Sequence, residues 1–306
     1  MGFEDKGALT VLSFGAGQDS TWLLYKFALD PEFRALHAPG RLVVVGSDTG
    51  DEHPETIEHV QFCREFAEVH GIEFYFLDPS MGYHSEAWAT LMTQYYRNNT
   101  VGSVMFSRTC TDNLKIQPMY RFLAQWLRNQ GYAPDSKNAA EPFRAFAKEN
   151  GRIRMCLGFT FDEGKRVDKT LKRAASQETP AYRRDCVEFS FPLVAVGFDR
   201  DAVQKDIRAM NLPLPPPSNC LRCHFRSDLD IIWLHRNHPA KFEEWVERED
   251  AKLMRFADKG EKNLGVYGKV HLREKLATAL SLHPNVTNEE LEHHRMTHGH
   301  CISNSF

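Results

Sequence analysis

A glycine-containing turn between an apolar strand and a helix, near the start of the chain, limits the possible folds more than any other feature. Residues 8–12 read as a buried strand and residues 21–27 as a helix, with Ser-Phe-Gly-Ala-Gly-Gln-Asp-Ser at 13–20 between them. Small residues let the backbone approach a ligand, and the unpaired N–H groups of a first helical turn attract an anion. The turn lacks the Gly-Lys-Ser/Thr ending of a Walker loop. It predicts a phosphate site of another type, with an ordinary strand-to-helix turn as the alternative.

Strand and helix signals continue to alternate along the chain. Further strands are predicted at 41–46, 72–77, 152–161 and 187–193, and helices at 54–70, 85–96, 116–128 and 199–210. This order predicts an α/β fold with a doubly wound parallel sheet, right-handed crossovers and ligands at the carboxyl ends of the strands. We expect an α/β domain at 1–212, including a polar insert at about 131–151, and a smaller helical C-terminal part at 213–306.

Composition narrows the class of protein. The chain has 306 residues and a net charge of −3, so its overall charge does not indicate a nucleic-acid-binding protein. Its start carries acidic residues rather than an apolar signal region, and its apolar runs are far shorter than the roughly 20 residues that span a membrane. We therefore expect a cytoplasmic protein without membrane contact. In that compartment, seven cysteines favour metal binding or catalysis over disulfides.

The turn at 13–20 resembles the pyrophosphate loop of the N-type ATP pyrophosphatases, usually written Ser-Gly-Gly-x-Asp-Ser. Gly17, Asp19 and Ser20 match this pattern, whereas Gly15 and Ala16 replace its serine and its first glycine. The segment 47–56, with Asp-Thr-Gly and Pro-Glu-Thr, resembles one in the phosphoadenosine phosphosulfate reductase family, a branch of the same superfamily. Three later stretches, at 108–119, 158–166 and 219–243, resemble further blocks of that family in the same order.

The resemblance implies an adenine nucleotide alpha hydrolase-like fold, in which residues 1–212 bind ATP with Mg²⁺. The residues that it assigns to nucleotide binding are Ser13, Gly15, Ala16, Gly17, Gln18, Asp19, Ser20, Asp48, Thr49, Gly158, Lys165 and Arg166. Asp19, Lys115 and Cys110 are the expected catalytic residues, and Asp162 is a candidate ligand for a divalent ion.

The cysteines indicate a second cofactor. Cys220 and Cys223 form a Cys-x-x-Cys pair, and soft thiolates select zinc or an iron–sulfur centre. Cys110 falls where iron–sulfur members of the family place a cysteine, and the basic residues beside it, Arg108 and Lys115, favour a thiolate. Three cysteines suit a [4Fe–4S] cluster with one open iron. Zinc, with His224 as a further ligand, and free thiols are the alternatives. Three other cysteines are predicted to be structural: Cys63, Cys156 and Cys186.

Together these features predict an ATP-dependent sulfurtransferase, which adenylates a substrate carbonyl, releases pyrophosphate and replaces the oxygen by sulfur. We expect a nucleobase-like small molecule as acceptor, as in the enzymes that make 6-thioguanine, together with a sulfur donor and a homodimer. A tRNA thiolase is less favoured, because the sequence shows no basic stripe. The alternatives are a sulfonucleotide reductase that uses Cys301, a DNA phosphorothioation or tRNA thiolation protein, and a non-catalytic nucleotide-binding partner. The histidine-rich tail is either a metal patch or a solvated segment.

Overall fold

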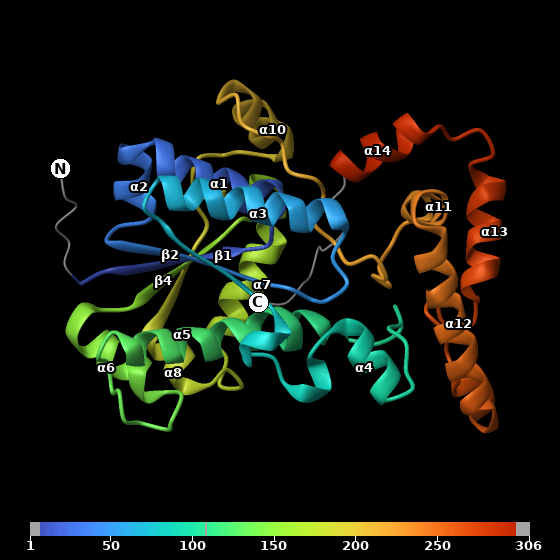
Figure 1. The fold of residues 1–306 in the computed structure, drawn as a ribbon, viewed down its shortest axis with the longest axis horizontal. Coiled ribbons are helices and arrows are strands. Elements are labelled where there is room, and N and C mark those ends of the chain that lie inside the picture. Colours follow the sequence, from blue (N-terminus) through green and yellow to red (C-terminus); the bar gives the residue numbers. More distant parts are fainter. Residues whose placement is uncertain (1–6, 108, 298–306) are drawn as a thin grey trace.

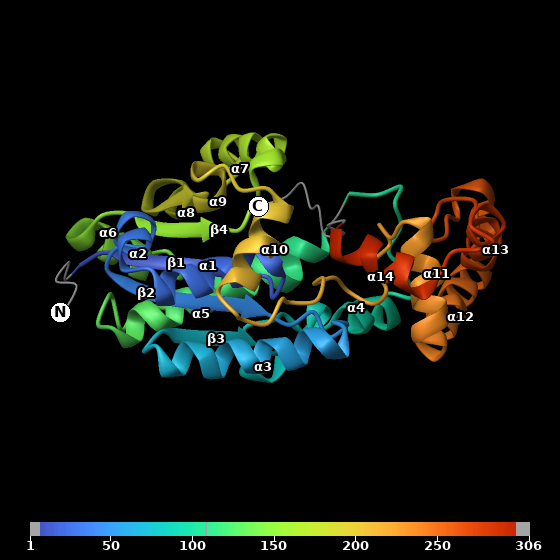
Figure 2. The same ribbon diagram turned by 90° about the horizontal axis from the view of Figure 1, so that it is seen from above.

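The computed structural model describes residues 7–107 and 109–297. Within them, one sheet has the strand order β3-β2-β1-β4-β5, and every neighbouring pair is parallel. Its strands are β1 (Leu9–Phe14), β2 (Arg41–Ser47), β3 (Glu73–Leu77), β4 (Ile153–Leu157) and β5 (Val187–Ser190). The chain adds strands outward from β1 on one side and then, starting with β4, on the other (Figure 2). This is the predicted doubly wound sheet, with its topological switch point between β1 and β4.

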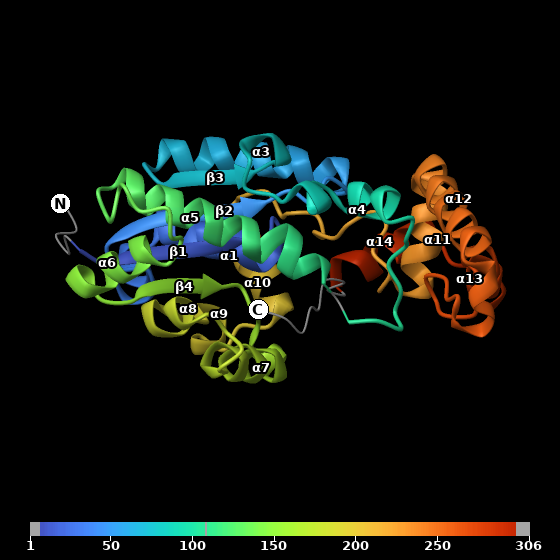
Figure 3. The ribbon, with the colours of Figure 1, turned by 90° about the horizontal axis from the view of Figure 1, so that it is seen from below.

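Helices cover both faces of the sheet (Figures 1 and 3). One face carries α1 (Gln18–Leu29), α2 (Pro31–His37), α3 (Pro54–Val69), α9 (Pro192–Ala195) and α10 (Arg200–Ala209). The other carries α5 (Gln117–Asn129), α6 (Glu141–Asn150), α7 (Gly164–Ala175) and α8 (Ala181–Cys186). Successive strand residues enter opposite cores, as Val11 and Leu12 do, because a strand points its side chains alternately to its two faces.

Two strands end earlier than predicted, at the edge of the sheet where ligands are expected. β4 ends at Leu157, because Thr160 and Glu163 form a capping box that begins the 3₁₀ turn η4 (Phe161–Glu163). β5 ends at Ser190, because Pro192 opens α9. The residues that follow each strand therefore form loops at the carboxyl edge of the sheet.

One predicted helix also differs. The region 85–96 is a 3₁₀ turn, η2 (Glu86–Trp88), followed by α4 (Leu91–Arg97), whose first turn is capped by Thr90. The second half of the predicted polar insert at 131–151 forms α6, which buries Phe143 and Phe146 in the core of the sheet. A π-helical turn, η3 (Asp112–Ile116), leads into α5.

The C-terminal part forms a helical layer with a core of its own. It contains α11 (Asp228–Asn237), α12 (Pro239–Arg255), the 3₁₀ segment η5 (Ala257–Lys262), α13 (Leu272–Leu282) and α14 (Asn288–Thr297). Trp233, Phe242 and Trp245 are almost fully buried in this core. Figure 1 shows these helices in orange and red beyond one end of the sheet, with α14 directed back toward the α/β part. A domain division near residue 212 stays a prediction. None of the described helices has the length and apolar character needed to cross a lipid bilayer.

Candidate nucleotide and cysteine site

The main cavity lies at the carboxyl ends of β1, β2 and β4, where a doubly wound sheet binds its ligands. Its walls include most residues that the resemblance assigns to nucleotide binding or catalysis, namely Ser13, Gly15, Gly17, Gln18, Asp19, Ser20, Lys115, Gly158 and Arg166. Five predicted residues are absent from its walls, namely Ala16, Asp48, Thr49, Cys110 and Lys165. The structure also adds Glu163, Arg200, Arg295 and Met296, which the sequence did not single out.

Residues 13–20, here called the phosphate loop, enter α1 without a side-chain cap at its first residue. The Ser20 hydroxyl accepts a hydrogen bond from the Gly15 amide and donates one to the Gly17 carbonyl, each at 3.2 Å. Ala16 is buried and has φ +56°, a left-handed conformation that costs a residue with a Cβ roughly 1–2 kcal/mol. The loop therefore keeps a strained turn even where alanine replaces the usual glycine, and local strain of this kind is concentrated at functional sites.

Asp19 lies at the base of the cavity and pairs with an arginine from another helix. Its Oδ2 accepts a hydrogen bond from Arg200 Nη2 at 3.0 Å. Burial raises the pKa of Asp19 to about 6, although the Arg200 charge acts in the opposite direction. Its Oδ1 is buried and has no hydrogen-bond partner among the described residues. Nothing in the sequence marks Arg200, because only the packing of α10 against α1 brings it to the phosphate loop.

The block at 158–166 contributes four residues to the cavity walls, namely Gly158, Phe159, Glu163 and Arg166. Glu163 and Arg166 line it and pair with each other at 2.5 Å, and the Arg166 guanidinium lies 4.0 Å from the centre of the Phe159 ring. Their neighbours Asp162 and Lys165 are exposed and lie outside the cavity walls. The inward carboxylate and cation of this block are thus Glu163 and Arg166.

The loop after β2 faces the cysteines rather than the main cavity. The Thr49 hydroxyl lies 3.3 Å from Cys220 Sγ and donates a hydrogen bond to Glu52 Oε1 at 2.9 Å. Lys115, which lines the cavity, places its Nζ 3.5 Å from the same Glu52 oxygen. Asp48 is half-buried, and burial raises its pKa. Lys115 and Glu52 therefore connect the phosphate side of the site with the cysteine side.

Cys110, Cys220 and Cys223 gather around one tyrosine. Cys110 and Cys220 both pack against the cluster that contains Tyr95, which is 3% exposed. Burial raises the pKa of the Tyr95 hydroxyl well above its ordinary value, and the nearby charges of all three cysteines act in the same direction. That hydroxyl has no hydrogen-bond partner among the described residues. A buried donor beside three thiols suits a sulfur-rich cofactor, whose sulfur atoms accept hydrogen bonds.

The backbone beside Tyr95 leaves room only for glycine. A Cβ on Gly102 would lie 2.4 Å from Tyr95 Oη and 2.5 Å from His224 Nδ1. Zinc would draw its ligands to roughly 2.0–2.3 Å from one ion, whereas each thiolate of a cluster binds a different iron. Among the described residues, the groups whose ligand atoms lie within 4.8 Å of one another do not include these cysteines. The [4Fe–4S] cluster at these cysteines therefore stays a prediction, with zinc and free thiols as the alternatives.

Residues 219–225, here called the cysteine segment, are bonded to the loop after β2. The Leu221 amide donates to the Asp51 carbonyl at 2.7 Å, and the Arg222 amide donates to Asp51 Oδ2 at 2.8 Å. The Arg222 guanidinium pairs with Asp51 and with Glu244. These contacts of Asp51 hold the cysteine segment in place, and nucleotide binding by Asp48 and Thr49 stays a prediction.

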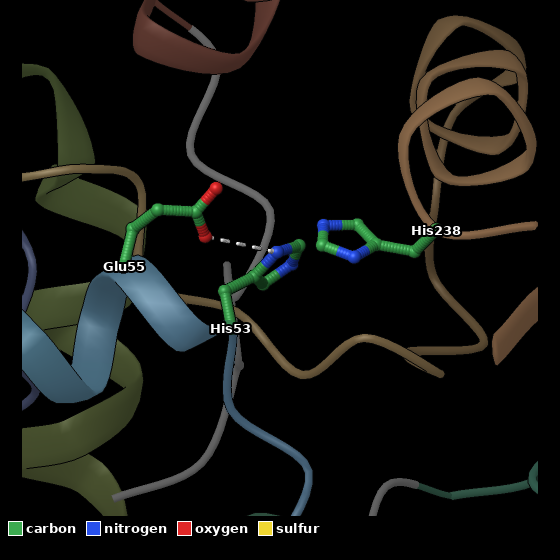
Figure 4. A group of neighbouring side chains, drawn as sticks. All are labelled: His53, Glu55 and His238. Carbon is green, nitrogen blue, oxygen red and sulfur yellow. Dashed lines mark ion pairs between the residues drawn. The ribbon is translucent and has the colours of Figure 1, made fainter.

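A histidine pair next to this segment is the other group of potential ligands near the site (Figure 4). His53 Nδ1 lies 3.9 Å from Glu55 Oε2, and His238 faces the same space. However, His53 Nε2 accepts a hydrogen bond from Arg226 Nη2 at 3.0 Å, so a neutral ring carries its proton on Nδ1. Burial lowers the pKa of His53 to about 2, with further lowering by Arg226 and Arg295. A ring nitrogen that bears a proton beside two arginines is a poor ligand for a cation.

The remaining cysteines divide into two groups. Cys63, Cys156 and Cys186 are buried in the two cores of the sheet, as predicted for structural residues. Cys301, the predicted nucleophile of the reductase alternative, lies outside the described residues, as do Arg108, His298 and His300. The polar tail is helical over 288–297 and reaches the main cavity through Arg295 and Met296.

No protein-family model and no curated protein sequence matches this chain. A solved structure that is similar to it is the U34-tRNA thiolase NcsA from Methanococcus maripaludis with its [4Fe-4S] cluster. The two chains are 13% identical, with a TM-score of 0.37, and the match covers 92% of this chain and 74% of the thiolase. The function of this chain is therefore inferred from its own residues.

Proposed function

We propose that this chain is an ATP-dependent sulfurtransferase of the ATP pyrophosphatase type. The observation that carries the proposal is the position of Lys115 between the two halves of the site. Lys115 lines the cavity of the phosphate loop and pairs with Glu52, which is bonded to Thr49 beside Cys220. Adenylation and delivery of sulfur both need the same acceptor atom, so a phosphate site and a thiol site in direct contact suit this chemistry.

The first step activates the acceptor. Its carbonyl oxygen attacks the α-phosphorus of ATP, the bond from that phosphorus to the bridging oxygen breaks, and pyrophosphate leaves. The amides of the first turn of α1, with Lys115, Arg166 and Arg200, stabilise the negative charge that develops on the phosphates. Asp19 keeps the Arg200 guanidinium at the base of the cavity.

The second step exchanges the oxygen. Hydrosulfide attacks the activated carbon, the carbon–oxygen bond breaks, AMP departs with that oxygen, and loss of the sulfur proton leaves a thiocarbonyl. No electrons are gained or lost overall. A [4Fe–4S] cluster held by Cys110, Cys220 and Cys223 supplies, when bound, an open position for the sulfide. The Thr49 hydroxyl contacts Cys220 Sγ from the protein side, and the buried Tyr95 hydroxyl supplies a donor whose hydrogen bond a cluster sulfur would accept.

A nucleobase-like heterocycle remains the proposed acceptor, and a specific observation supports a second candidate. Helix α7 carries five basic residues and one acidic residue, and Lys165, Lys169, Lys172 and Arg173 are exposed on it beside the cavity residue Arg166. The net charge of the chain is −3, but these cations lie together on one helix next to the site. An acceptor base within a nucleic acid would find a positive surface there.

The test is anaerobic incubation of the reconstituted protein with ATP, sulfide and either free nucleobases or short RNAs. We expect pyrophosphate release that depends on the acceptor, and a product in which mass spectrometry shows one oxygen replaced by sulfur. Lys115→Gln should lower the rate about 100-fold or more, because it removes a cation from the developing charge. Lys137→Gln, an exposed change on a distant loop, is the matched control. Sulfite release from adenylyl sulfate without ATP cleavage would instead establish the reductase.

A further inference from the structure

Helix α14 crosses from the C-terminal helical layer to the phosphate loop. Leu291 is fully buried in the core of that layer. At the other end of the helix, the Met296 carbonyl accepts hydrogen bonds from Gln18 Nε2 at 3.3 Å and Gln204 Nε2 at 2.9 Å. Gln18 occupies the variable position of the phosphate loop. The last turn of α14 is therefore tied directly to the loop and to α10.

Arg295, the residue before Met296, lines the main cavity and is 3% exposed. Its Nη1 donates to Glu292 Oε2 at 3.0 Å, and its guanidinium lies 3.4 Å from the centre of the Trp233 ring. Its Nε and Nη2 are buried and have no hydrogen-bond partner among the described residues. These two atoms form one edge of the guanidinium, the edge that binds a carboxylate or phosphate through two parallel hydrogen bonds.

The other arginines of the cavity differ in this respect. Arg166 pairs with Glu163 at 2.5 Å, and Arg200 pairs with Asp19 at 3.0 Å. The acidic partner of Arg295, Glu292, is half exposed and contacts only its Nη1 side. A guanidinium stays charged at any working pH, and a buried edge without an acceptor costs stability. Arg295 thus has both the charge and the free donors for an anion in the cavity.

We propose that Arg295 binds the phosphate chain of the nucleotide, so that the C-terminal helical layer contributes a cation to the phosphate site beside the phosphate loop. The ligand class is a nucleoside polyphosphate or its pyrophosphate product. This inference rests on the proposed function, because it needs a nucleotide in the main cavity. It assigns α14 a role that no motif in the sequence indicates, and it links nucleotide binding to the layer that follows the cysteine segment.

The test is calorimetric binding of α,β-methylene-ATP and of adenosine to the reconstituted protein and its variants. Arg295→Gln should weaken binding of the triphosphate analogue about tenfold to a hundredfold, the range for a charge-assisted pair, and leave adenosine binding unchanged. Arg295→Lys should recover part of the loss. Arg273→Gln, an exposed arginine on the neighbouring α13, is the matched control and should behave as wild type.

Adenosine separates ligand binding from a structural role. If Arg295→Gln weakens both ligands equally, or neither, Arg295 is not a phosphate ligand and the proposed function still stands. If the wild type does not bind the analogue, the proposed function itself fails. If the variant does not fold, hydrogen exchange measured on the wild type alone still tests the inference. Amide hydrogen exchange over 288–297 should slow with the triphosphate analogue and not with adenosine, and equal exchange in both would overturn the inference.

Discussion

Neighbouring residues in the block at 158–166 point in different directions, and this decides which of them line the cavity. Glu163 and Arg166 line the cavity, whereas Asp162 and Lys165 are exposed. The motif places a charged block after β4. The backbone geometry of the 3₁₀ turn η4 and of the first turn of α7 determines which side chains of that block point into the cavity. A sequence pattern therefore identifies such a block more reliably than it identifies the functional side chain within it.

Tyr95 provides a test of the cysteine side that does not depend on turnover. Replacing Tyr95 by phenylalanine removes the buried hydroxyl and leaves the packing of the ring. We expect the reconstituted variant to retain its visible absorbance but to show a lower reduction potential, because hydrogen bonds to cluster sulfurs favour the reduced form. A redox titration of the absorbance measures this shift. Tyr96→Phe, an exposed neighbour on α4, should have the wild-type potential. An unchanged potential in Tyr95→Phe, or no visible absorbance in either protein, would contradict the assignment.

The buried histidine His59 should make the free energy of unfolding depend on pH. Its Nε2 lies 2.9 Å from Thr21 Oγ1 and 3.2 Å from Cys63 Sγ, and burial lowers its pKa to about 4. Between pH 6.5, near the pKa of a histidine in the unfolded chain, and about pH 4, the folded pKa of His59, the unfolded chain binds a proton that the folded protein does not. The free energy of unfolding therefore falls as the pH falls through this range. The slope from one such group is at most about 1.4 kcal/mol per pH unit. Urea unfolding at pH 7.5 and 5.5 should show a smaller decrease for His59→Gln than for the wild type or for the exposed control His293→Gln.

At the scale of elements, the end of β4 lies directly against the phosphate loop. A Cβ on Gly158 would lie 2.9 Å from the Ser20 amide nitrogen and 3.0 Å from the Asp19 carbonyl carbon. These are backbone atoms of the first turn of α1, so they cannot move away without distorting the loop. Glycine at this position is therefore needed for the close approach of two elements.

Gly158→Ala should therefore weaken nucleotide binding through a displaced loop. We expect at least about a tenfold loss of affinity for α,β-methylene-ATP, equivalent to about 1.4 kcal/mol. Gly164→Ala, at the first residue of α7, has no atom within 4 Å of the added Cβ and should leave affinity unchanged. Calorimetry on both variants measures the effect. Equal affinities would show that the loop tolerates the added methyl group.

At the scale of the whole molecule, the cysteine segment depends on the α/β part for its position. Asp51 accepts hydrogen bonds from the backbone of Leu221 and Arg222 and pairs with the buried Arg222 guanidinium. Glu52 and Cys220 also form an isolated antiparallel bridge. The sheet and the C-terminal layer are therefore joined through the site itself, so the two halves of the proposed chemistry are positioned by one set of contacts.

Removal of Asp51 should destabilise the molecule strongly. Asp51→Ala leaves Arg222 as a buried cation with only the half-exposed Glu244 as partner, and breaking a buried pair in this way costs about 3–5 kcal/mol. Glu244→Ala removes the more exposed partner and should cost clearly less. Chemical unfolding of both variants measures the difference. Similar losses in the two would mean that Asp51 does not anchor the cysteine segment.

Local signals determined the fold class and the phosphate loop. The apolar strands, the glycine turn after β1 and the alternation of strands and helices were sufficient, because they depend on hydrophobic periodicity and backbone geometry within short segments. The same signals placed Gly15, Asp19 and Ser20 at the edge of the sheet. Element ends were less accurate, since caps such as Thr90 and Thr160 compete with the apolar pattern.

Only the tertiary structure decided which distant residues complete the site. Arg200 and Arg295 reach the cavity through helix packing, and Tyr95 reaches the cysteines through the fold of the chain between β3 and α5. None of them belongs to a motif, because their positions follow from contacts between residues far apart in the sequence. The physical reason is that the burial of apolar surface is non-directional. It packs helices onto the sheet without a local sequence pattern that marks which distant residues become neighbours.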